Sequence, residues 1–434
     1  MRVLITNLFV DHNSGTETVV EILADGLRRA GHQPMIYAPM LGPQAERMRV
    51  RGHVLADRLD ALPARPDVIH AQHVTPTLMA IAAFPGTPVL YACHSSRFAL
   101  ETPVLHPSVR RYVAVDGLCR DRCLAAGVPE DRLSVILNAV DLERFLPRPP
   151  LPARPARALL LGKRTLHRTF VQAACAAEGL ELHELGKGAG KVSAALEHDL
   201  VGYDIVFASA RCAIEAAAVG CAVVVCDGRG FAGMLTAADL PAWRPMNFGA
   251  GVLVHPNSVE ALRRAIRSYD PVEAARVSAL VRADAGLEQS VADHLELYRQ
   301  CLADPPPAGD AGAAAMARLL EDYLPTPAER PWRELVSEQG LTPRRPDEVL
   351  EAMETRLLRA VDLAGKAAAK AAARDGALED RLLKAIGLSD KAGAREIAAL
   401  RADVRSALRA SRPSKPEKPP KPPKPKKAER VGEG

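Results

Sequence analysis

This 434-residue sequence is poor in several residues and patterns that would mark a specialised chain. Aromatic residues make up only 4% of it, so a hydrophobic core has to be assembled mainly from alanine, valine and leucine. Its eight cysteines form no CxxC pair and several lie within apolar runs, which predicts buried free thiols in a reducing compartment. An Asp-x-Asp pair is also missing, and we expect no bound metal.

Long hydrophobic runs are absent as well. No stretch approaches the roughly 20 apolar residues that a membrane-spanning helix needs. The N-terminal MRVLITNLFV carries only a short apolar run that leads into DHNSG, which is not the pattern of a signal peptide. We therefore expect a cytoplasmic protein.

The positive charge of the chain lies at its C-terminal end. Residues 411–434 contain eight Lys or Arg and three Glu, whereas the rest of the chain has 49 residues of each sign. A body without net charge argues against nucleic acid as a partner, because a nucleic-acid-binding domain would itself be basic. Two interpretations of the Lys/Pro-rich tail stay open: a disordered, solvated end, or attraction to anionic lipid at the inner face of a membrane.

Strand-like and helix-like segments alternate through the first 148 residues. An amphipathic helix is expected at residues 16–31, and the segment LSVILNAVDLERF (133–145) closes this half before the Pro-rich linker RPPLPARPARA. Short apolar runs typical of strands occur at residues 2–9, 33–39, 67–73, 88–94 and 111–116. Strands separated by helices predict a parallel, doubly wound sheet.

The same alternation begins again after the linker. ALLLGK (158–163) is the first strand-like run of this half, followed by a helix, ELHELG, the segment 204–230 and GVLVHP (251–256). Asn257 or Ser258 is expected to cap the next helix, and residues 287–303 form an amphipathic helix. The fold class is therefore α/β with two Rossmann-like domains, at residues 1–148 and 149–303. A helical extension at 304–410 and the disordered tail at 411–434 follow.

The most informative segment is DIVFASARCAIEAAAVGCAVVVCDGRG, residues 204–230. It predicts a strand, a short loop of small residues, a helix, a second strand and a Gly-rich turn. Glu215 is a single carboxylate in the first turns of an otherwise apolar helix, where it can hold a nucleotide ribose. An ordinary buried βαβ unit with a solvated glutamate is the alternative.

Two further segments have the pattern of a phosphate site. Gly15 and Thr16 stand at the start of a helix directly after the first strand, where backbone N–H groups can bind a phosphate. Lys163 and Arg168 follow the first strand of the second half and can meet a diphosphate across a cleft. Each of these has a plain alternative, an ordinary strand–helix turn or a solvated basic face.

Three parts of the sequence are typical of a known family: GTETVVEILADGLRRAGH, DVIHAQH with PVLYACHS, and ILNAVDLERF. In these parts residues 1–303 resemble the retaining, nucleotide-sugar-dependent GT-B glycosyltransferases of family four. The resemblance implies that Gly15 and Thr16 face the donor diphosphate, that His94 is the catalytic-site histidine near the sugar, and that Lys163 and Arg168 neutralise the diphosphate. Glu215 matches the second Glu of the family's Glu-x7-Glu motif, which holds the ribose. His70 matches a structural position, so that His70 and His73 are not expected to bind metal.

The sequence also departs from the family pattern. The first Glu of the motif would fall at Phe207, Ala139 replaces the usual Gly of the NGVD motif, and Lys163 stands where Arg is usual. Arg211 in the loop and Gly228 in the DGRG turn are instead expected to contact the donor, as in a divergent branch.

The function that the resemblance implies is metal-independent, cofactor-free transfer of a sugar, in the manner of a bacterial hexosyltransferase of polysaccharide biosynthesis. The partners would be a nucleotide-sugar donor and a glycan, lipid-linked or small-molecule acceptor, with peripheral contact at the inner membrane face through the tail. The alternative is a catalytically degenerate GT-B scaffold that binds nucleotide and acts through its helical C-terminal region. A nucleotide-sugar epimerase is a third hypothesis, but the extra carboxylates that it needs are not found.

Overall fold

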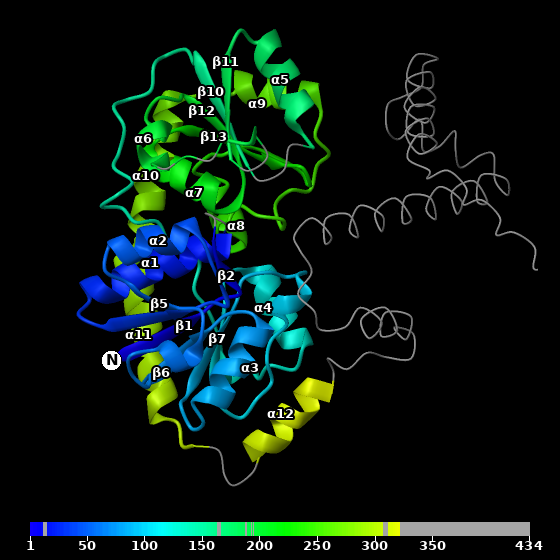
Figure 1. Ribbon diagram of the computed structural model, residues 1–434. Coiled ribbons are helices and arrows are strands. Elements are labelled where there is room, and N and C mark those ends of the chain that lie inside the picture. The colour runs from blue at the N-terminus through cyan, green and yellow to red at the C-terminus, as the bar shows by residue number, and fades with distance from the viewer. Residues whose placement is uncertain are drawn as a thin grey trace, which may run out of the picture. The chain divides into compact units, whose positions relative to one another are not determined.

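The computed structural model describes residues 1–11, 15–162, 166–186, 189–191, 193, 195–306 and 311–321. Lys163, the expected helices at 347–374 and 377–410 and the tail at 411–434 lie outside the described residues. Within the described part, two sheets of mainly parallel strands form one after the other along the chain (Figure 1). Every helix of that part is too short or too polar to span a lipid bilayer.

The first sheet has seven parallel strands in the order β5-β3-β1-β6-β7-β8-β9. Its inner strands are buried on both faces, which explains their almost continuous runs of apolar residues. The strands are β1 (Arg2–Thr6), β3 (Gln33–Tyr37), β5 (Val54–Ala56), β6 (Val68–Ala71), β7 (Val89–Cys93), β8 (Val109–Ala114) and β9 (Leu133–Val135). A separate parallel pair is formed by β2 (Phe9–Val10) and β4 (Met40–Leu41).

The helices of this half alternate with its strands, as the sequence predicts. The expected helix at 16–31 is α1 (Gly15–Arg29), and α4 begins after Asp116, whose carboxylate accepts a hydrogen bond from the backbone N–H of Cys119 at 2.8 Å. The other helices are α2 (Pro43–Val50), α3 (Val74–Ala83), α4 (Gly117–Ala125), and the 3-10 turns η1 (Leu59–Ala61), η2 (Ala99–Glu101) and η3 (Glu130–Arg132).

The second sheet has five strands in the order β11-β10-β12-β13-β14, and only the last pair is antiparallel. Its strands are β10 (Arg157–Leu161), β11 (Glu181–Leu185), β12 (Ile205–Ala208), β13 (Ala222–Asp227) and β14 (Gly230–Met234). Its helices are α5 (Arg168–Ala177), α6 (Leu196–Leu200), α7 (Ala210–Val219), α8 (Leu240–Trp243), η5 (Arg244–Met246), α9 (Val259–Arg267) and α10 (Pro271–Asp284).

The segment 204–230 folds as its sequence predicts. The strand β12, the helix α7 and the strand β13 follow one another, and α7 is buried from Ala213 to Val219. Gly220 ends α7 with a φ of 100°, and its N–H donates to the carbonyls of Ala216 and Ala217. Of the two cap candidates for α9, Ser258 is the one whose side chain accepts a hydrogen bond, from Ala261 N–H at 3.2 Å.

One strand-like segment of the second half, GVLVHP (251–256), forms no strand. The place beside β13 is taken by β14, and His255 makes only an isolated bridge to Phe231. A Cβ at Gly230 would meet the carbonyls of Leu253 and His255, so the segment lies close against β14 and pairs with it at His255.

Helix α11 (Leu287–Ala303) follows the second domain in the sequence but packs in the core of the first. Leu287, Val291, Leu295 and Tyr298 belong to the same hydrophobic cluster as α1 and the first sheet (Figure 1). Helix α12 (Ala311–Glu321) also packs on the first domain, against a second hydrophobic cluster, through Met316 and Leu319. All eight cysteines are free thiols, and seven are buried, as the sequence predicts.

Packing of α11 on α1 gives a test of this arrangement. A methyl group added at Gly26 of α1 would lie 2.5 Å from Cγ2 of Val291 on α11. We expect Gly26→Ala to lower the free energy of unfolding by about 1–2 kcal/mol, because overpacking outweighs the helix-propensity gain of about 1 kcal/mol.

Urea denaturation of Gly26→Ala, Val291→Ala and the double variant measures this effect. The double variant should lose less free energy of unfolding than the two single variants together, since Val291→Ala removes the clash. A Gly26→Ala protein as stable as wild type would contradict the packing.

Candidate active site

A small cavity lies where the carboxyl ends of first-sheet strands meet the start of α7. Its solvent-accessible volume is about 30 Å³. Most of the lining is apolar; the polar residues that line it are His70, His94, Asn138, Arg211, Ser290 and His294. His94 and Asn138 come from the first half of the chain and Arg211 from the second, so the two halves jointly build this site. The carboxyl ends of strands are where open parallel sheets bind their ligands.

His94 follows the last residue of β7 and is fixed through its backbone. Its N–H donates to Oε2 of the buried Glu101 at 2.8 Å. Its ring Nε2 is buried and has no hydrogen-bond partner. Burial lowers the pKa of His94 to about 3, so the imidazole is neutral at physiological pH. His94 therefore acts in this site as a polar, uncharged ring.

Arg211 and Glu215 form an ion pair across one turn of α7. Nη2 of Arg211 donates to Oε1 of Glu215 at 2.6 Å, and Nη1 donates to the carbonyl of Ala139 at 3.3 Å. The two side chains are only 12% and 7% exposed. Ala139 belongs to the first half of the chain and lines the cavity. Arg211 therefore links Glu215, the candidate ribose ligand, to the cavity wall.

The segment Arg244–Phe248, called here the 244–248 turn, holds the two halves of the site together. Asn247 donates through Nδ2 to the carbonyl of Val115, and its Oδ1 accepts from the N–H of Asn138 at 3.1 Å and from Arg244 at 2.7 Å. Nη2 of Arg244 donates to the carbonyl of Asn138 at 3.0 Å. Both peptide groups of the cavity-lining Asn138 are thus bonded to this turn.

Backbone strain is concentrated at the same place. Asn247 and Phe248 have φ angles of 48° and 51°, and Ala210, the first residue of α7, has 52°. The N–H of Ala210 donates to the carbonyl of Phe248 at 2.9 Å. A non-glycine residue in the left-handed region costs about 1–2 kcal/mol, so the surrounding contacts have to over-determine this geometry. The 244–248 turn therefore sets where α7, and with it Arg211, begins.

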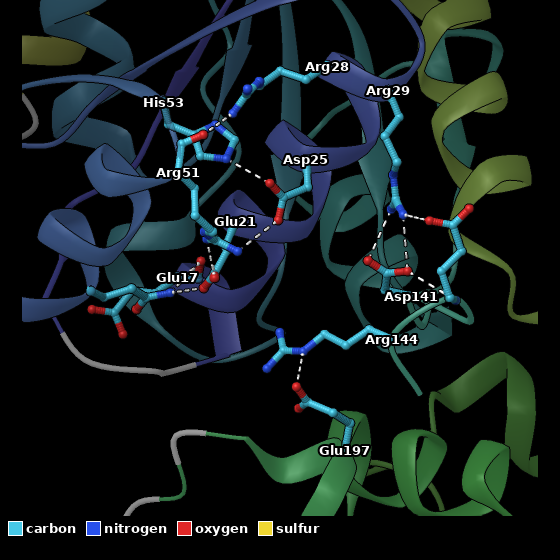
Figure 2. A network of polar contacts seen from close by, with 12 residues as sticks. Glu17, Glu21, Asp25, Arg28, Arg29, Arg51, His53, Asp141, Arg144 and Glu197 are labelled. Atoms are coloured by element: carbon cyan, nitrogen blue, oxygen red, sulfur yellow. Dashed lines mark hydrogen bonds and ion pairs between the residues drawn. The ribbon is translucent and has the colours of Figure 1, made fainter. Parts of the chain in front are cut away.

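The segment 136–145 is held by ion pairs just after the cavity residues Asn138 and Ala139. Arg29 of α1 contacts Asp141 at 3.1 Å and Glu143, and Arg144 contacts Glu197 of α6 at 2.8 Å (Figure 2). The first of these contacts ties the segment to the first domain and the second ties it to the second. The NAVD motif (residues 138–141) thus lies in a segment that contacts both domains.

The other sequence-predicted residues lie apart from the cavity lining. Gly15 and Thr16 form the first turn of α1, and Val19, Ile22 and Leu23 of the same helix line the cavity. Arg168 is exposed at the start of α5 and is paired with Glu184 of β11 at 2.7 Å.

Gly228 lies in the turn between β13 and β14, and its backbone packs against Leu166. The structure therefore brings together His94, Arg211 and Glu215, whereas Arg168 and Gly228 do not line the cavity.

Several residues of the site were not predicted from the sequence. Arg244 and Asn247 lie in WRPMNFG, a segment without periodicity, and His294 lies on a helix whose pattern shows only its amphipathic face. Glu17 is 1% exposed in the first turn of α1, and its Oε1 accepts the N–H of Asp11 at 2.8 Å. The only available signal was NAVD itself, whose Asn138 lines the cavity. Within the described ranges, no three His, Cys, Asp or Glu side chains are grouped as metal ligands.

Comparison with known proteins bears on both the fold and the first domain. Residues 13–144 match the model of Glycosyltransferase Family 4, which is less than half of the chain. Crystal structures of HepE from Anabaena superpose with a TM-score of 0.51 in the complex with UDP and 0.50 in the complex with UDP and glucose. Each has 12% sequence identity and covers 68% of this chain and 99–100% of HepE.

The fold is GT-B. This confirms the fold class expected from the sequence, two Rossmann-like domains with parallel sheets. MurG of Acinetobacter baumannii is also similar, with a TM-score of 0.44 at 13% identity over 69% of this chain and 99% of MurG. No curated protein matches the chain. At identities this low the structural likeness defines the fold and not the substrate.

The 244–248 turn leads to a stability prediction. Asn247→Ala removes three side-chain hydrogen bonds and keeps the strained φ, so we expect it to lower the free energy of unfolding by about 2–3 kcal/mol. Asn247→Gly removes the same bonds but relieves the strain, and should be more stable than Asn247→Ala by about 1 kcal/mol. Chemical denaturation of both variants measures the difference; equal stabilities would show that the φ of Asn247 is not strained.

Buried neutral histidines lead to a prediction on pH. The pKa values of His94 and His73 are lowered to about 3 and about 4 in the folded state, against about 6.5 in an unfolded chain. The unfolded state therefore binds more protons below pH 6.5, and stability is lost as the pH falls from there toward the folded-state values.

The free energy of unfolding falls by up to about 1.4 kcal/mol for each histidine when the pH falls by one unit in this range. Replacing His94 by Gln should reduce the slope of unfolding free energy against pH between about 6 and 4. An unchanged slope in urea titrations over this range would show that His94 titrates alike in both states.

Proposed function

We propose that this protein transfers a sugar from a nucleoside-diphosphate sugar to an acceptor. The observation that carries the proposal is the convergence of His94, Arg211 and Glu215 at the carboxyl ends of strands from two Rossmann-like domains. The match of residues 13–144 to Glycosyltransferase Family 4 supports it. Because HepE has the same fold and was crystallised with UDP and UDP-glucose, a uridine nucleotide is the first donor to test.

The chemistry needs positive charge opposite the leaving group. When the bond between the sugar and the diphosphate breaks, negative charge grows on the β-phosphate, and fixed donors placed there lower the barrier. Arg211 supplies a guanidinium at the cavity, and the positive end of the α1 dipole at Gly15 and Thr16 adds to it. With these groups, and with Lys163 and Arg168, the reaction proceeds without a metal ion.

Glu215 is proposed to bind the ribose. Arg211 occupies its Oε1, and a carboxylate accepts several hydrogen bonds, so the pair can bind a ribose hydroxyl and a phosphate side by side. Arg168 has to leave Glu184 before it can reach the donor. Gly228 would allow the donor to approach the β13–β14 turn closely.

His94 is the catalytic residue in this proposal. Its low pKa keeps the ring neutral, so it orients a sugar hydroxyl by hydrogen bonding and adds no charge. A glycan, lipid-linked or small-molecule acceptor enters from the first domain, and contact between the domains excludes water. Retention of the anomeric configuration, a hexosyl donor and peripheral attachment to the inner membrane face follow from the resemblance and the charged tail, and belong to the same proposal.

A catalytically degenerate GT-B scaffold is the second candidate, and one observation favours it. Phe207, at the position of the first Glu of the family motif, is wholly buried in β12 between β10 and β13. No carboxylate can reach the donor sugar from there. A scaffold of this kind would still bind nucleotide but would show no turnover.

A thermal-shift screen against UDP, GDP, ADP and their sugars tests the donor site. We expect one nucleotide family to stabilise the wild type, by about 2.7 kcal/mol at a concentration of 100 times Kd. Glu215→Gln should lose this stabilisation because it removes the ribose contact. Glu143→Gln, at a side chain that is 71% exposed, is the control that should keep it.

The outcomes separate the two candidates. Stabilisation by a nucleotide sugar with turnover that is lost in His94→Gln supports the transferase. Stabilisation without turnover on any acceptor favours the scaffold. A wild type that responds to no nucleotide would contradict both.

A further inference from the structure

Two buried imidazole nitrogens share the cavity of the candidate active site. Nε2 of His70 and Nε2 of His94 are both buried without a hydrogen-bond partner, and both rings line the cavity. A buried polar group left unpaired costs about 1–3 kcal/mol. A polar cavity of roughly 10–15 Å³ or more is large enough to hold one water molecule. The cavity volume of about 30 Å³ therefore suits one hydrogen-bonded water.

Tyr298 of α11 determines which nitrogen of His70 carries the proton. Its hydroxyl lies 2.8 Å from Nδ1 of His70, and both side chains are buried. Burial raises the pKa of the Tyr298 phenol well above its usual value and lowers the pKa of His70 well below its own, so the phenol is protonated and the imidazole neutral. Within the described residues the O–H of Tyr298 has Nδ1 of His70 as its one acceptor, and donation to it leaves no buried hydroxyl proton unpaired. The single ring proton of His70 is then on Nε2, an atom of a ring that lines the cavity.

The third histidine of the cavity cannot supply a proton to His94. Nδ1 of His294 lies 2.7 Å from the carbonyl of Ser290, and because a carbonyl only accepts, this nitrogen carries the proton. Burial lowers the pKa of His294, so the ring is neutral and its Nε2 has only a lone pair. Arg211, the charged residue at the cavity, directs one N–H of each terminal nitrogen to Glu215 and to Ala139.

We propose that one water molecule in this cavity accepts the Nε2–H of His70 and donates to Nε2 of His94, so that Tyr298 and His70 fix the tautomer of His94. The chain runs Tyr298 O–H, His70, water, His94, with every group neutral and no net proton transfer. His94 then carries its proton on Nδ1 and can only donate from that nitrogen. Tyr298 and His70 are positioning residues, and their effect on turnover rests on the proposed function.

The tautomers can be read without any substrate. In protein labelled with ¹⁵N-histidine, long-range ¹H–¹⁵N spectra distinguish protonated from unprotonated ring nitrogens, and His94→Gln and His70→Gln assign the signals. We expect Nε2 unprotonated and Nδ1 protonated in His94, and the reverse in His70. A protonated Nε2 in His94 of the wild type overturns the proposal, whether or not any variant folds.

Tyr298→Phe tests the link between the two rings. It keeps the aromatic ring in the core but removes the donor to His70, so the ¹⁵N signals of both His70 and His94 should move toward the average of two tautomers. Tyr112→Phe is the matched control, because it removes another buried hydroxyl, which donates to the carbonyl of Val104 at 2.9 Å away from the cavity. An unchanged His94 in folded Tyr298→Phe overturns the proposal.

Turnover is measured separately. Loss of the tautomer should lower kcat by on the order of tenfold with little change in KM for the donor, since no donor contact is removed. If no donor is ever turned over, the proposed function fails while the spectra still decide on the tautomer. Altered spectra with an unchanged kcat would overturn the role of the tautomer in catalysis.

Discussion

The site depends first on the hydrogen bonds between the 244–248 turn and Asn138. His94 and Asn138 belong to one Rossmann-like domain and Arg211 and Glu215 to the other, and residues on separate domains form a site only if something fixes one domain against the other. Asn247 and Arg244 bind both peptide groups of Asn138, while the carbonyl of Phe248 binds the first residue of α7. The strain at Ala210, Asn247 and Phe248 is the energetic cost of placing Arg211 against the wall of the first domain.

Burial defines the chemistry of this site as much as position does. Histidines inside an apolar wall remain neutral, because removing them from water disfavours the charged form. Arg211 is thereby left as the charged residue of the cavity lining. Helix α11 contributes to this environment, since it brings Ser290, His294 and Tyr298 to the first domain from beyond the second.

Much of the fold could be predicted from the sequence for a local reason. Strands buried on both faces are continuous apolar runs, and helices that cover a sheet show one apolar face, so β1, α1, β12, α7 and β13 were all recognisable. Phosphate and ribose candidates could be placed because the start of a helix after a strand is a local feature. The strand-like segment 251–256 forms no strand because it pairs with β14 through a single residue, His255, and the length over which two segments pair is not encoded in either one alone.

By itself the sequence determined the α/β class, the two sheets and their order along the chain, and it marked His94, Arg211 and Glu215 as residues of interest. The fold class could be determined because period and turn chemistry act over a few residues, whereas His94 and Arg211 were marked by the resemblance to family four. Only the tertiary structure decided that Arg168 is paired with Glu184, that α11 returns to the first domain, and that His70, His94 and Tyr298 meet at one cavity. Tyr298 and His70 alone are 228 positions apart, and the partners of such distant residues are chosen by packing.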